Sequence, residues 1–301
     1  MVGRPRDADR RVSRVAQVVE QVDSANAAYA ARPFDYQKAL HEMVHRYIAT
    51  TLGVVVLGLA VYAWRHRRNP RQPLRLPLIL PLIIAGQGAL GAFTVTLLLT
   101  PVIVTSHLLG GLTTLSILWW LSLTPETRSA SAAERSVRPL ALLAFAALMV
   151  QLFLGGWTST NYAAVSCPDF PTCQGGYHPI TDYANAFRFT HEAGRDYEGG
   201  VLPQAARTAI HFTHRIGAVL AGALLFLTGL LTTIRARSPR VRSAGMALMG
   251  AVILQWLIGM NLIWQGFPLW LGTSHNAGAV LLLLATLTVL RRLWPARDSG
   301  P

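Results

Sequence analysis

Seven long apolar segments follow one another along the chain, separated by polar stretches. They lie near residues 44–64, 77–99, 101–122, 138–160, 208–234, 243–264 and 272–293. Each is long enough for a helix to cross a bilayer, which takes roughly 20 apolar residues. The pattern therefore predicts an all-α polytopic membrane protein with seven spans, in which Pro101 marks a very short turn between the second and third spans.

The polar segments predict how the chain is divided. We expect a polar N-terminal arm at 1–40, an N-terminal helix bundle at 41–122, a cytoplasmic linker at 123–137, a C-terminal helix bundle at 138–294 with an external loop at 161–207, and a tail at 295–301. The arm carries arginines but no apolar segment of spanning length, so we expect it to be neither a span nor a signal peptide.

Arginine is concentrated in alternate loops. The chain is 52% hydrophobic and only 14% charged, with a net charge of +13, whereas soluble domains carry about a quarter charged residues. Arginines in short loops between spans mark the cytoplasmic side, and they lack the interleaved aromatic residues of a nucleic-acid-binding surface. We therefore expect a multi-pass protein of the cell inner (plasma) membrane, with loops 65–75, 123–138 and 235–242 in the cytoplasm and no nucleic-acid partner.

One stretch of the chain occurs twice. The first copy, QGALGAFTVTLLLTPVIVTSH, ends at His107, and the second, QWLIGMNLIWQGFPLWLGTSH, ends at His275. A His-Arg pair precedes each copy, because His45 lies 62 residues before His107 and His214 lies 61 residues before His275. A repeat on this scale indicates two copies of one structural unit. With the loop assignment above, it places two histidines near the external face in each half.

These four histidines are the strongest functional signal in the chain. A histidine inside a membrane is expensive unless it is paired, hydrated or bound to a ligand, although a hydrogen bond between helices explains a single one equally well. Two imidazoles on facing helices are a standard way to bind a haem iron axially. We therefore predict two iron-binding haem sites, one with His45 and His107 and one with His214 and His275.

Arginines and glycines near the histidines fit the same hypothesis. Arg46 and Arg215 each follow a histidine and suit contacts with haem propionates, although anchoring at the membrane interface explains them equally well. His211, one turn before His214, is expected to be solvated or next to the iron ligand. Glycines that leave room for a flat macrocycle, or only for close helix packing, are Gly88, Gly91, Gly110, Gly111, Gly217, Gly222 and Gly259.

A competing metal site is contained in residues 41–45, which read HEMVH. They match the H-E-x-x-H pattern of zinc metalloproteases. His41 has no equivalent in the second half and no obvious third ligand follows, so a membrane zinc protease is the weaker alternative. Next to a haem, Glu42 would accept a proton or stabilise positive charge on an oxidised carbon, because it lies one turn before His45. Otherwise it is a solvated residue at a helix start.

The only two cysteines, Cys167 and Cys173, lie in the predicted external loop. Disulfides form and persist outside the cytoplasm, so a structural disulfide is the preferred interpretation. A redox-active dithiol is the alternative.

Several motifs together resemble the haem A synthase family. Residues 42–46, EMVHR, are similar to its E-x-x-H-R motif. The other similar stretches are QGALGAFTV…TSHL, NYAAVSCPDFPTCQG, IHFTHRIGA and FPLWLGTSHNAGA, and the resemblance runs from about residue 35 to residue 293. It implies two helix bundles related by a pseudo-twofold axis, with eight spans. The second half of this chain has four spans and the first half three, which indicates that the family's first helix is missing, through a gene start assigned too far downstream or in a true seven-span protein.

The resemblance also implies an activity. The family oxidises the C8 methyl group of haem O to a formyl group, which gives haem A for cytochrome oxidase assembly. By residue, it implies His45 and His107 on the substrate haem, His214 and His275 on a haem b cofactor, Glu42 as the catalytic carboxylate, and a Cys167–Cys173 disulfide. The implied partners are a haem O synthase (protohaem farnesyltransferase) as supplier, the oxidase assembly machinery, an unidentified electron acceptor and the lipid bilayer. The main alternative is a di-haem b-type membrane electron-transfer protein.

Overall fold

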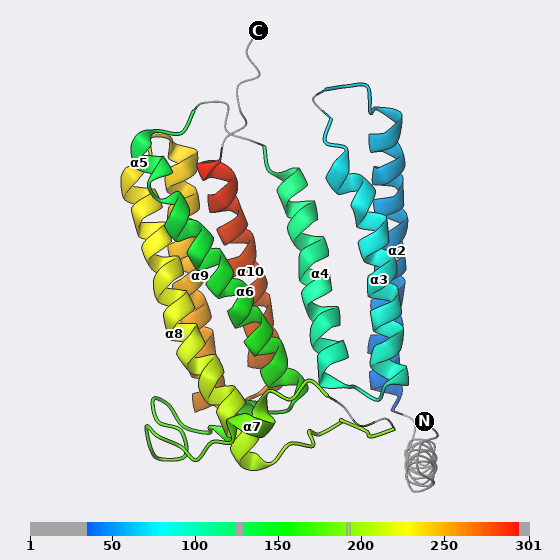
Figure 1. Cartoon of the computed structure of the whole chain (residues 1–301), viewed down its shortest axis with the longest axis vertical. Coiled ribbons are helices and arrows are strands. Elements are labelled where there is room, and N and C mark those ends of the chain that lie inside the picture. The colour runs from blue at the N-terminus through cyan, green and yellow to red at the C-terminus, as the bar shows by residue number, and fades with distance from the viewer. Residues whose placement is uncertain (1–34, 71, 125–128, 191, 193, 295–301) are drawn as a thin grey trace, which may run out of the picture. The chain divides into compact units, whose positions relative to one another are not determined.

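The computed structural model describes residues 35–70, 72–124, 129–190, 192 and 194–294, and no β-strand occurs among them. The long helices are α2 (Tyr36–Arg65), α3 (Arg75–Thr96), α4 (Pro101–Ser122), α6 (Arg138–Thr160), α8 (Gln204–Arg235), α9 (Pro239–Trp264) and α10 (Leu269–Leu293) (Figure 1). Two short helices, α5 (Ala132–Arg135) and α7 (Tyr183–Ala186), lie in the loops. Seven helices of the described chain are long and apolar enough to cross a membrane, which confirms the predicted all-α polytopic fold.

Helix α2 begins earlier than the apolar pattern predicts. The Asp35 carboxylate caps it by accepting the backbone N–H groups of Gln37 and Lys38 at 3.0 and 3.1 Å. Such a cap typically contributes about 1 kcal/mol to helix stability. Residues 36–40 of the predicted arm are therefore helical, while residues 1–34 lie outside the described part of the chain.

The predicted linker at 123–137 contains a helix of its own. The Ser131 hydroxyl accepts the Glu134 N–H at 3.1 Å, and the Glu134 carboxylate accepts the Ser131 N–H at 2.8 Å. The other carboxylate oxygen accepts the N–H of Arg237 at 2.9 Å. Glu134 is therefore buried with both oxygens hydrogen-bonded, and it ties the linker to the loop between α8 and α9.

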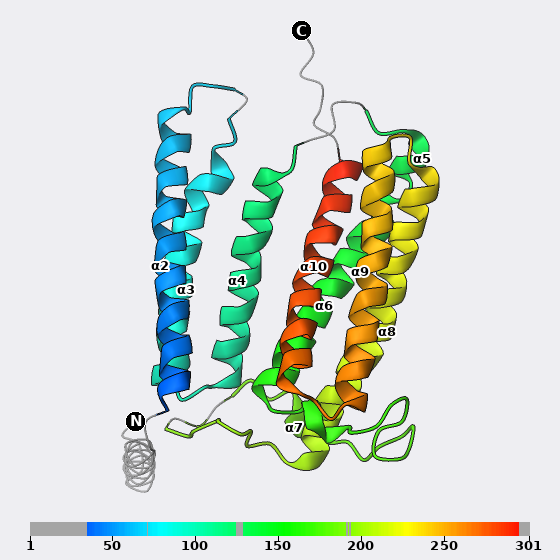
Figure 2. The same ribbon diagram turned by 180° about the vertical axis from the view of Figure 1, so that it is seen from behind.

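The chain forms two compact units. One contains Met1–His107 and Arg188–Val201, and the other contains Leu108–Phe187 and Leu202–Pro301. In the second unit, α6, α8, α9 and α10 lie side by side as a four-helix bundle (Figures 1 and 2). In the first unit, α2 packs against α3. The predicted bundles at 41–122 and 138–294 remain predictions about domain boundaries.

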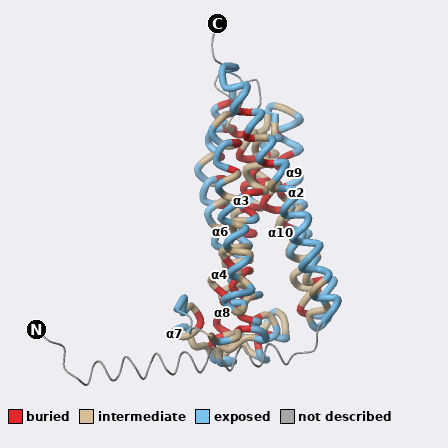
Figure 3. Tube along the Cα trace, turned by 90° about the vertical axis from the view of Figure 1, so that its right-hand side faces the viewer, coloured by how far each residue is buried: buried red, intermediate tan, exposed pale blue. Residues whose placement is uncertain are grey.

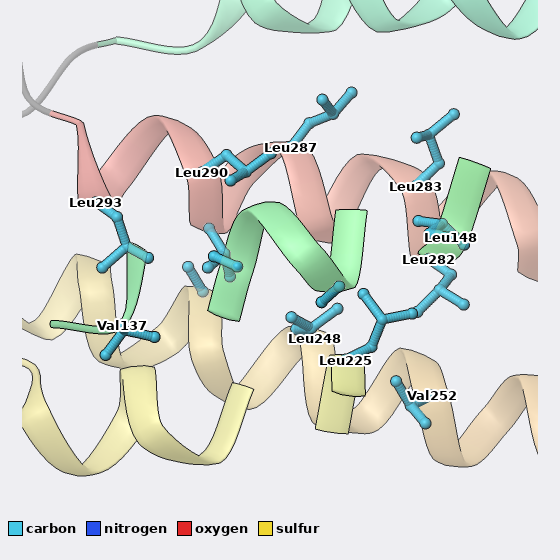
Figure 4. Packing of buried hydrophobic residues seen from close by; sticks show 14 of the residues in the cluster. Val137, Leu148, Leu225, Leu248, Val252, Leu282, Leu283, Leu287, Leu290 and Leu293 are labelled. Atoms are coloured by element: carbon cyan, nitrogen blue, oxygen red, sulfur yellow. The ribbon is translucent and has the colours of Figure 1, made fainter. Parts of the chain in front are cut away.

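Leucine side chains from all four helices fill the core of the second unit. Figure 4 shows Leu148 of α6, Leu225 of α8, Leu248 of α9 and Leu283 of α10 in this core. Each of the four is at most 1% exposed. Lipid tails are as apolar as leucine, so in a membrane such a core stabilises the bundle mainly through close packing.

Glycines allow α8 and α9 to approach each other closely. A Cβ atom at Gly245 would lie 2.6 Å from the Gly229 carbonyl oxygen and 2.5 Å from the Thr233 hydroxyl oxygen. A Cβ atom at Gly229 would lie 2.8 Å from the Gly245 carbonyl oxygen. No larger residue fits this crossing without moving a backbone, which is typical of small residues at membrane helix interfaces.

Helix α2 buries little of its surface. Only Val56, Ala60 and Ala63 are buried, and most of its other residues are exposed (Figure 3). An apolar helix with this much exposed surface is poorly suited to water and well suited to a bilayer.

Candidate functional site

Two histidine pairs form the candidate site, one in each unit. The ring centres of His45 and His107 are 6.3 Å apart with the planes inclined by 73°. The ring centres of His214 and His275 are 6.4 Å apart with the planes inclined by 80°. The structure thus brings His45 close to His107 and His214 close to His275, which are the two pairs that the repeat predicts. The two units repeat the same placement, because His107 and His275 each lie six residues after the first residue of their helix.

The ring separation fits one metal ion between two imidazoles. A metal–nitrogen bond of about 2 Å, with roughly 1 Å more from each nitrogen to its ring centre, places two ring centres about 6 Å apart. Among the described residues, no group of three or more His, Cys, Asp or Glu side chains is placed to hold a metal ion. Two imidazoles without further protein ligands suit an iron whose other ligands come from a porphyrin. The predicted zinc site at residues 41–45 gathers no third ligand in the described chain.

Each of three histidines lies against a glycine of the neighbouring helix. A Cβ atom at Gly91 would lie 3.3 Å from His107 Cε1, and one at Gly259 would lie 3.2 Å from His275 Cε1. Gly155 on α6 stands in the same relation to His214, at 3.2 Å. The repeat identified Gly91 and Gly259, but sequence reasoning missed Gly155. By contrast, a Cβ atom at Gly88 or Gly111 would meet nothing within 4 Å.

Two glutamine amides contact the second histidine pair. Gln151 Nε2 on α6 donates to the His214 carbonyl oxygen at 3.0 Å and lies 3.0 Å from His214 Nδ1. Gln255 Nε2 on α9 donates to the His275 carbonyl oxygen at 3.1 Å and lies 3.3 Å from both ring nitrogens. Sequence reasoning missed Gln151. The available signal was Q-x3-G, which occurs at 151–155 as well as at 87–91 and 255–259.

Arg215 holds the loop that contains the disulfide. Its guanidinium donates to three backbone carbonyl oxygens, those of Cys167 at 2.6 Å and of Asp169 and Thr172 at 2.8 Å each. The predicted Cys167–Cys173 disulfide is present. The predicted propionate contact of Arg215 remains a prediction, but the structure adds a role in loop anchoring that the sequence did not indicate.

Asp169 shapes the same loop. Its carboxylate accepts the Thr172 hydroxyl and the backbone N–H groups of Gln174 at 2.6 Å and Gly175 at 3.0 Å. The Thr172 hydroxyl contributes most to holding the pKa of the Asp169 carboxyl below its usual value. The loop is therefore folded around the ionised form of Asp169.

The residue one turn before the first histidine of each pair contacts the following arginine. In the first unit, Glu42 accepts a hydrogen bond from Arg46 at 2.5 Å, and both side chains are about half exposed. In the second unit, Arg215 Nε donates to His211 Nε2 at 3.4 Å. His211 is buried rather than solvated, and its ring also contacts the Phe267 ring edge-on, with the ring centres 6.2 Å apart. The predicted propionate contact of Arg46 stays a prediction.

Comparison with known proteins gives consistent similarities. A family model described as cytochrome oxidase assembly protein matches residues 13–287. A haem A synthase of Shewanella oneidensis is 38% identical over 282 residues, covering 93% of this chain and 84% of the relative. Haem A synthases of Novosphingobium aromaticivorans and Halalkalibacterium halodurans are 28% and 25% identical, covering 81% and 82% of this chain and 69% and 76% of the relatives.

Proposed function

The chain belongs to the cytochrome oxidase assembly protein family, and on this basis we propose that it is a haem A synthase. It is a membrane oxidoreductase that converts the C8 methyl group of haem O to a formyl group, giving haem A for cytochrome oxidase. The observation that carries the proposal is the pair of facing imidazoles in each unit, 6.3 and 6.4 Å between ring centres. That separation fits axial binding of a haem iron, and the relatives named haem A synthase cover most of the chain.

The two pairs have different tasks in this proposal. His45 and His107 hold the substrate haem, and His214 and His275 hold a haem b cofactor. Their surroundings support this division. His45 is exposed, as suits a site that a large substrate must enter and leave, whereas neither ring of the second pair is exposed and each contacts a glutamine amide. When bound, haem would supply the iron and the porphyrin methyl group, and the histidines would hold and orient it.

Glu42 is the proposed catalytic carboxylate. Oxidising a methyl to a formyl group with water as the source of the oxygen atom releases protons and electrons, so the site needs water, a base and an electron acceptor. Glu42 lies one helical turn before His45 and is held by Arg46 at 2.5 Å. In this position its carboxylate accepts a proton, or stabilises positive charge, beside the substrate ring. His214 and His275 would hold a haem b, which would supply a redox centre for electron transfer to an acceptor.

The membrane placement belongs to the same proposal. The arginine-rich loops at 65–75, 123–138 and 235–242 face the cytoplasm, and the disulfide loop and the histidine ends of the helices face outward. The chain receives haem O from a haem O synthase and delivers haem A to the oxidase assembly machinery.

The haem content of the purified full chain tests this function. Supplied with haem O, the wild type should contain haem A and haem b, and Glu42→Ala should keep bound haem but form no haem A. Glu198→Gln is the matched control, because Glu198 is also a carboxylate paired with a basic residue of α2, Lys38 at 3.1 Å. Finding only haem b in wild type supplied with haem O would favour the di-haem electron-transfer protein instead. The haem hypothesis predicts that His41→Ala keeps its bound haem, whereas the zinc-protease alternative predicts that this variant loses bound zinc and activity.

A further inference from the structure

We propose that Gln151 and Gln255 are positioning residues that fix the rotation of the His214 and His275 imidazoles and accept their ring N–H once iron is bound. The inference rests on the proposed haem binding by this pair and adds two residues to it. Both glutamines lie on the helix next to their histidine, Gln151 on α6 and Gln255 on α9.

Each glutamine amide contacts its histidine both at the backbone carbonyl oxygen and at the imidazole ring. Gln151 Nε2 reaches the backbone carbonyl oxygen and the ring Nδ1 of His214, each at 3.0 Å. Gln255 Nε2 reaches the His275 carbonyl oxygen at 3.1 Å and both ring nitrogens at 3.3 Å. A contact that joins backbone and ring of one residue restricts the rotation of its side chain. The backbone contact is the same in both copies, but the ring contact differs, since Gln151 Nε2 contacts one ring nitrogen and Gln255 Nε2, equally far from both, lies over the ring face.

The carbonyl oxygen of each glutamine amide is an unused hydrogen-bond acceptor. Oε1 of Gln151 and Oε1 of Gln255 are buried and have no hydrogen-bond partner among the described residues. Each oxygen sits where a side chain would otherwise be, because a Cβ atom at Gly217 would lie 2.3 Å from Gln151 Oε1 and one at Gly278 would lie 2.2 Å from Gln255 Oε1. Both glycines are three residues after the histidine. A buried acceptor without a partner costs about 1–3 kcal/mol, so such an oxygen requires an explanation.

Iron binding supplies that explanation. Gln151 Nε2 can only donate, so its contact with His214 Nδ1 is compatible with the tautomer in which Nδ1 accepts and the other ring nitrogen carries the hydrogen. A neutral imidazole that gives its other nitrogen to iron must carry its hydrogen on Nδ1, and such a hydrogen is normally donated to an oxygen. When the amide turns over, its N–H leaves the His214 carbonyl oxygen and Oε1 accepts the Nδ1 hydrogen, so that this hydrogen bond alone then fixes the ring. Glutamine therefore serves both states of the ring, since it has a donor and an acceptor on one group.

The first histidine pair lacks this support. Gln87 occupies the equivalent place before Gly91, but among the described residues its side chain makes no hydrogen bond to the His107 ring, which Gln87 approaches only through its backbone. The residue three positions after His107 is Gly110, as in the second pair, whereas the residue three positions after His45 is Ile48. In the described chain, the glutamine amide contacts are therefore found only at His214 and His275, the pair proposed to hold the haem b cofactor.

The test uses the full chain in detergent, in a His45→Ala background that leaves one complete histidine pair. Haem loss is measured by transfer to excess apomyoglobin, and the midpoint potential by spectroelectrochemistry. Gln151→Met, which keeps the shape and removes both hydrogen-bonding groups, should lose haem about 10- to 100-fold faster and should raise the midpoint potential. Gln151→Glu, which keeps an acceptor, should hold haem nearly as well as the parent and should lower the potential, because a stronger acceptor makes the ligand more basic. Gln255 variants should behave likewise, and Gln87→Met should match the parent.

The outcomes distinguish failure of the glutamine role from failure of the proposed haem A synthase function on which it rests. Parent-like haem loss and potential in Gln151→Met would overturn the inference. So would equal haem loss in Gln151→Met and Gln151→Glu without a change in potential, because that result indicates packing alone. If the His45→Ala parent itself shows no haem with two imidazole ligands, the proposed function fails before the glutamines are tested.

Discussion

Replacing Arg215 by methionine should loosen the disulfide loop without unfolding the helices. Three charge-assisted hydrogen bonds, to the carbonyl oxygens of Cys167, Asp169 and Thr172, are lost. Each such bond is worth about 1.5–3 kcal/mol, but the values do not add, and water replaces part of them at a surface loop. We therefore expect a local loss of about 2–4 kcal/mol, or roughly a 30- to 1,000-fold rise in loop opening at 1.4 kcal/mol for each factor of ten.

Hydrogen–deuterium exchange of a peptide that covers residues 166–176 measures this opening. The reporting amides are those of Cys173, which donates to the Gly176 carbonyl oxygen at 2.8 Å, and of Gln174 and Gly175, which donate to Asp169. Arg46→Met is the matched control, because Arg46 occupies the same place in the repeat but makes only a half-exposed ion pair, worth about 0–1 kcal/mol. Unchanged exchange in Arg215→Met, or the same change in both variants, would refute the anchoring role.

Three further predictions concern the fold and the loop. Gly245→Ala should lower the free energy of unfolding by about 1–3 kcal/mol in detergent, because its Cβ atom would meet a carbonyl oxygen of α8 at 2.6 Å, whereas Gly250→Ala, with nothing within 4 Å, should be neutral. Leu248→Ala should lower the free energy of unfolding in detergent by about 2–5 kcal/mol, because the side chain is fully buried among four helices. The pKa of Asp169 is lowered in the folded loop, so its contribution is present above its usual value of 3.8 and is lost as the pH falls through the lowered value. Reduction of the disulfide by a phosphine should therefore accelerate in acid in the wild type, and a flat profile, or the same profile in Asp169→Asn, would contradict this reasoning.

Much of the architecture follows from local properties of the chain. Hydropathy over windows of about 20 residues predicts the spans, because crossing a bilayer requires a continuous apolar helix. Helix starts were less accurate, since the side chain of Asp35 extends α2 through residues that are polar. The repeat also predicts which histidines meet, because two copies of one unit place equivalent residues at equivalent positions. His45 with His107 and His214 with His275 follow from spacing alone.

What surrounds the histidines was decided by tertiary structure. Gln151 and Gly155 lie on a helix that the two-copy repeat does not include, so their contact with His214 appears only when α6 and α8 pack together. Arg215 looked like a haem contact from its neighbour in the sequence, yet its donors reach a loop more than 40 residues away in the chain. Hydropathy and spacing determine where a helix and its histidine lie, whereas hydrogen-bond partners depend on which distant segments come within 3 Å of each other, and only the folded chain fixes that.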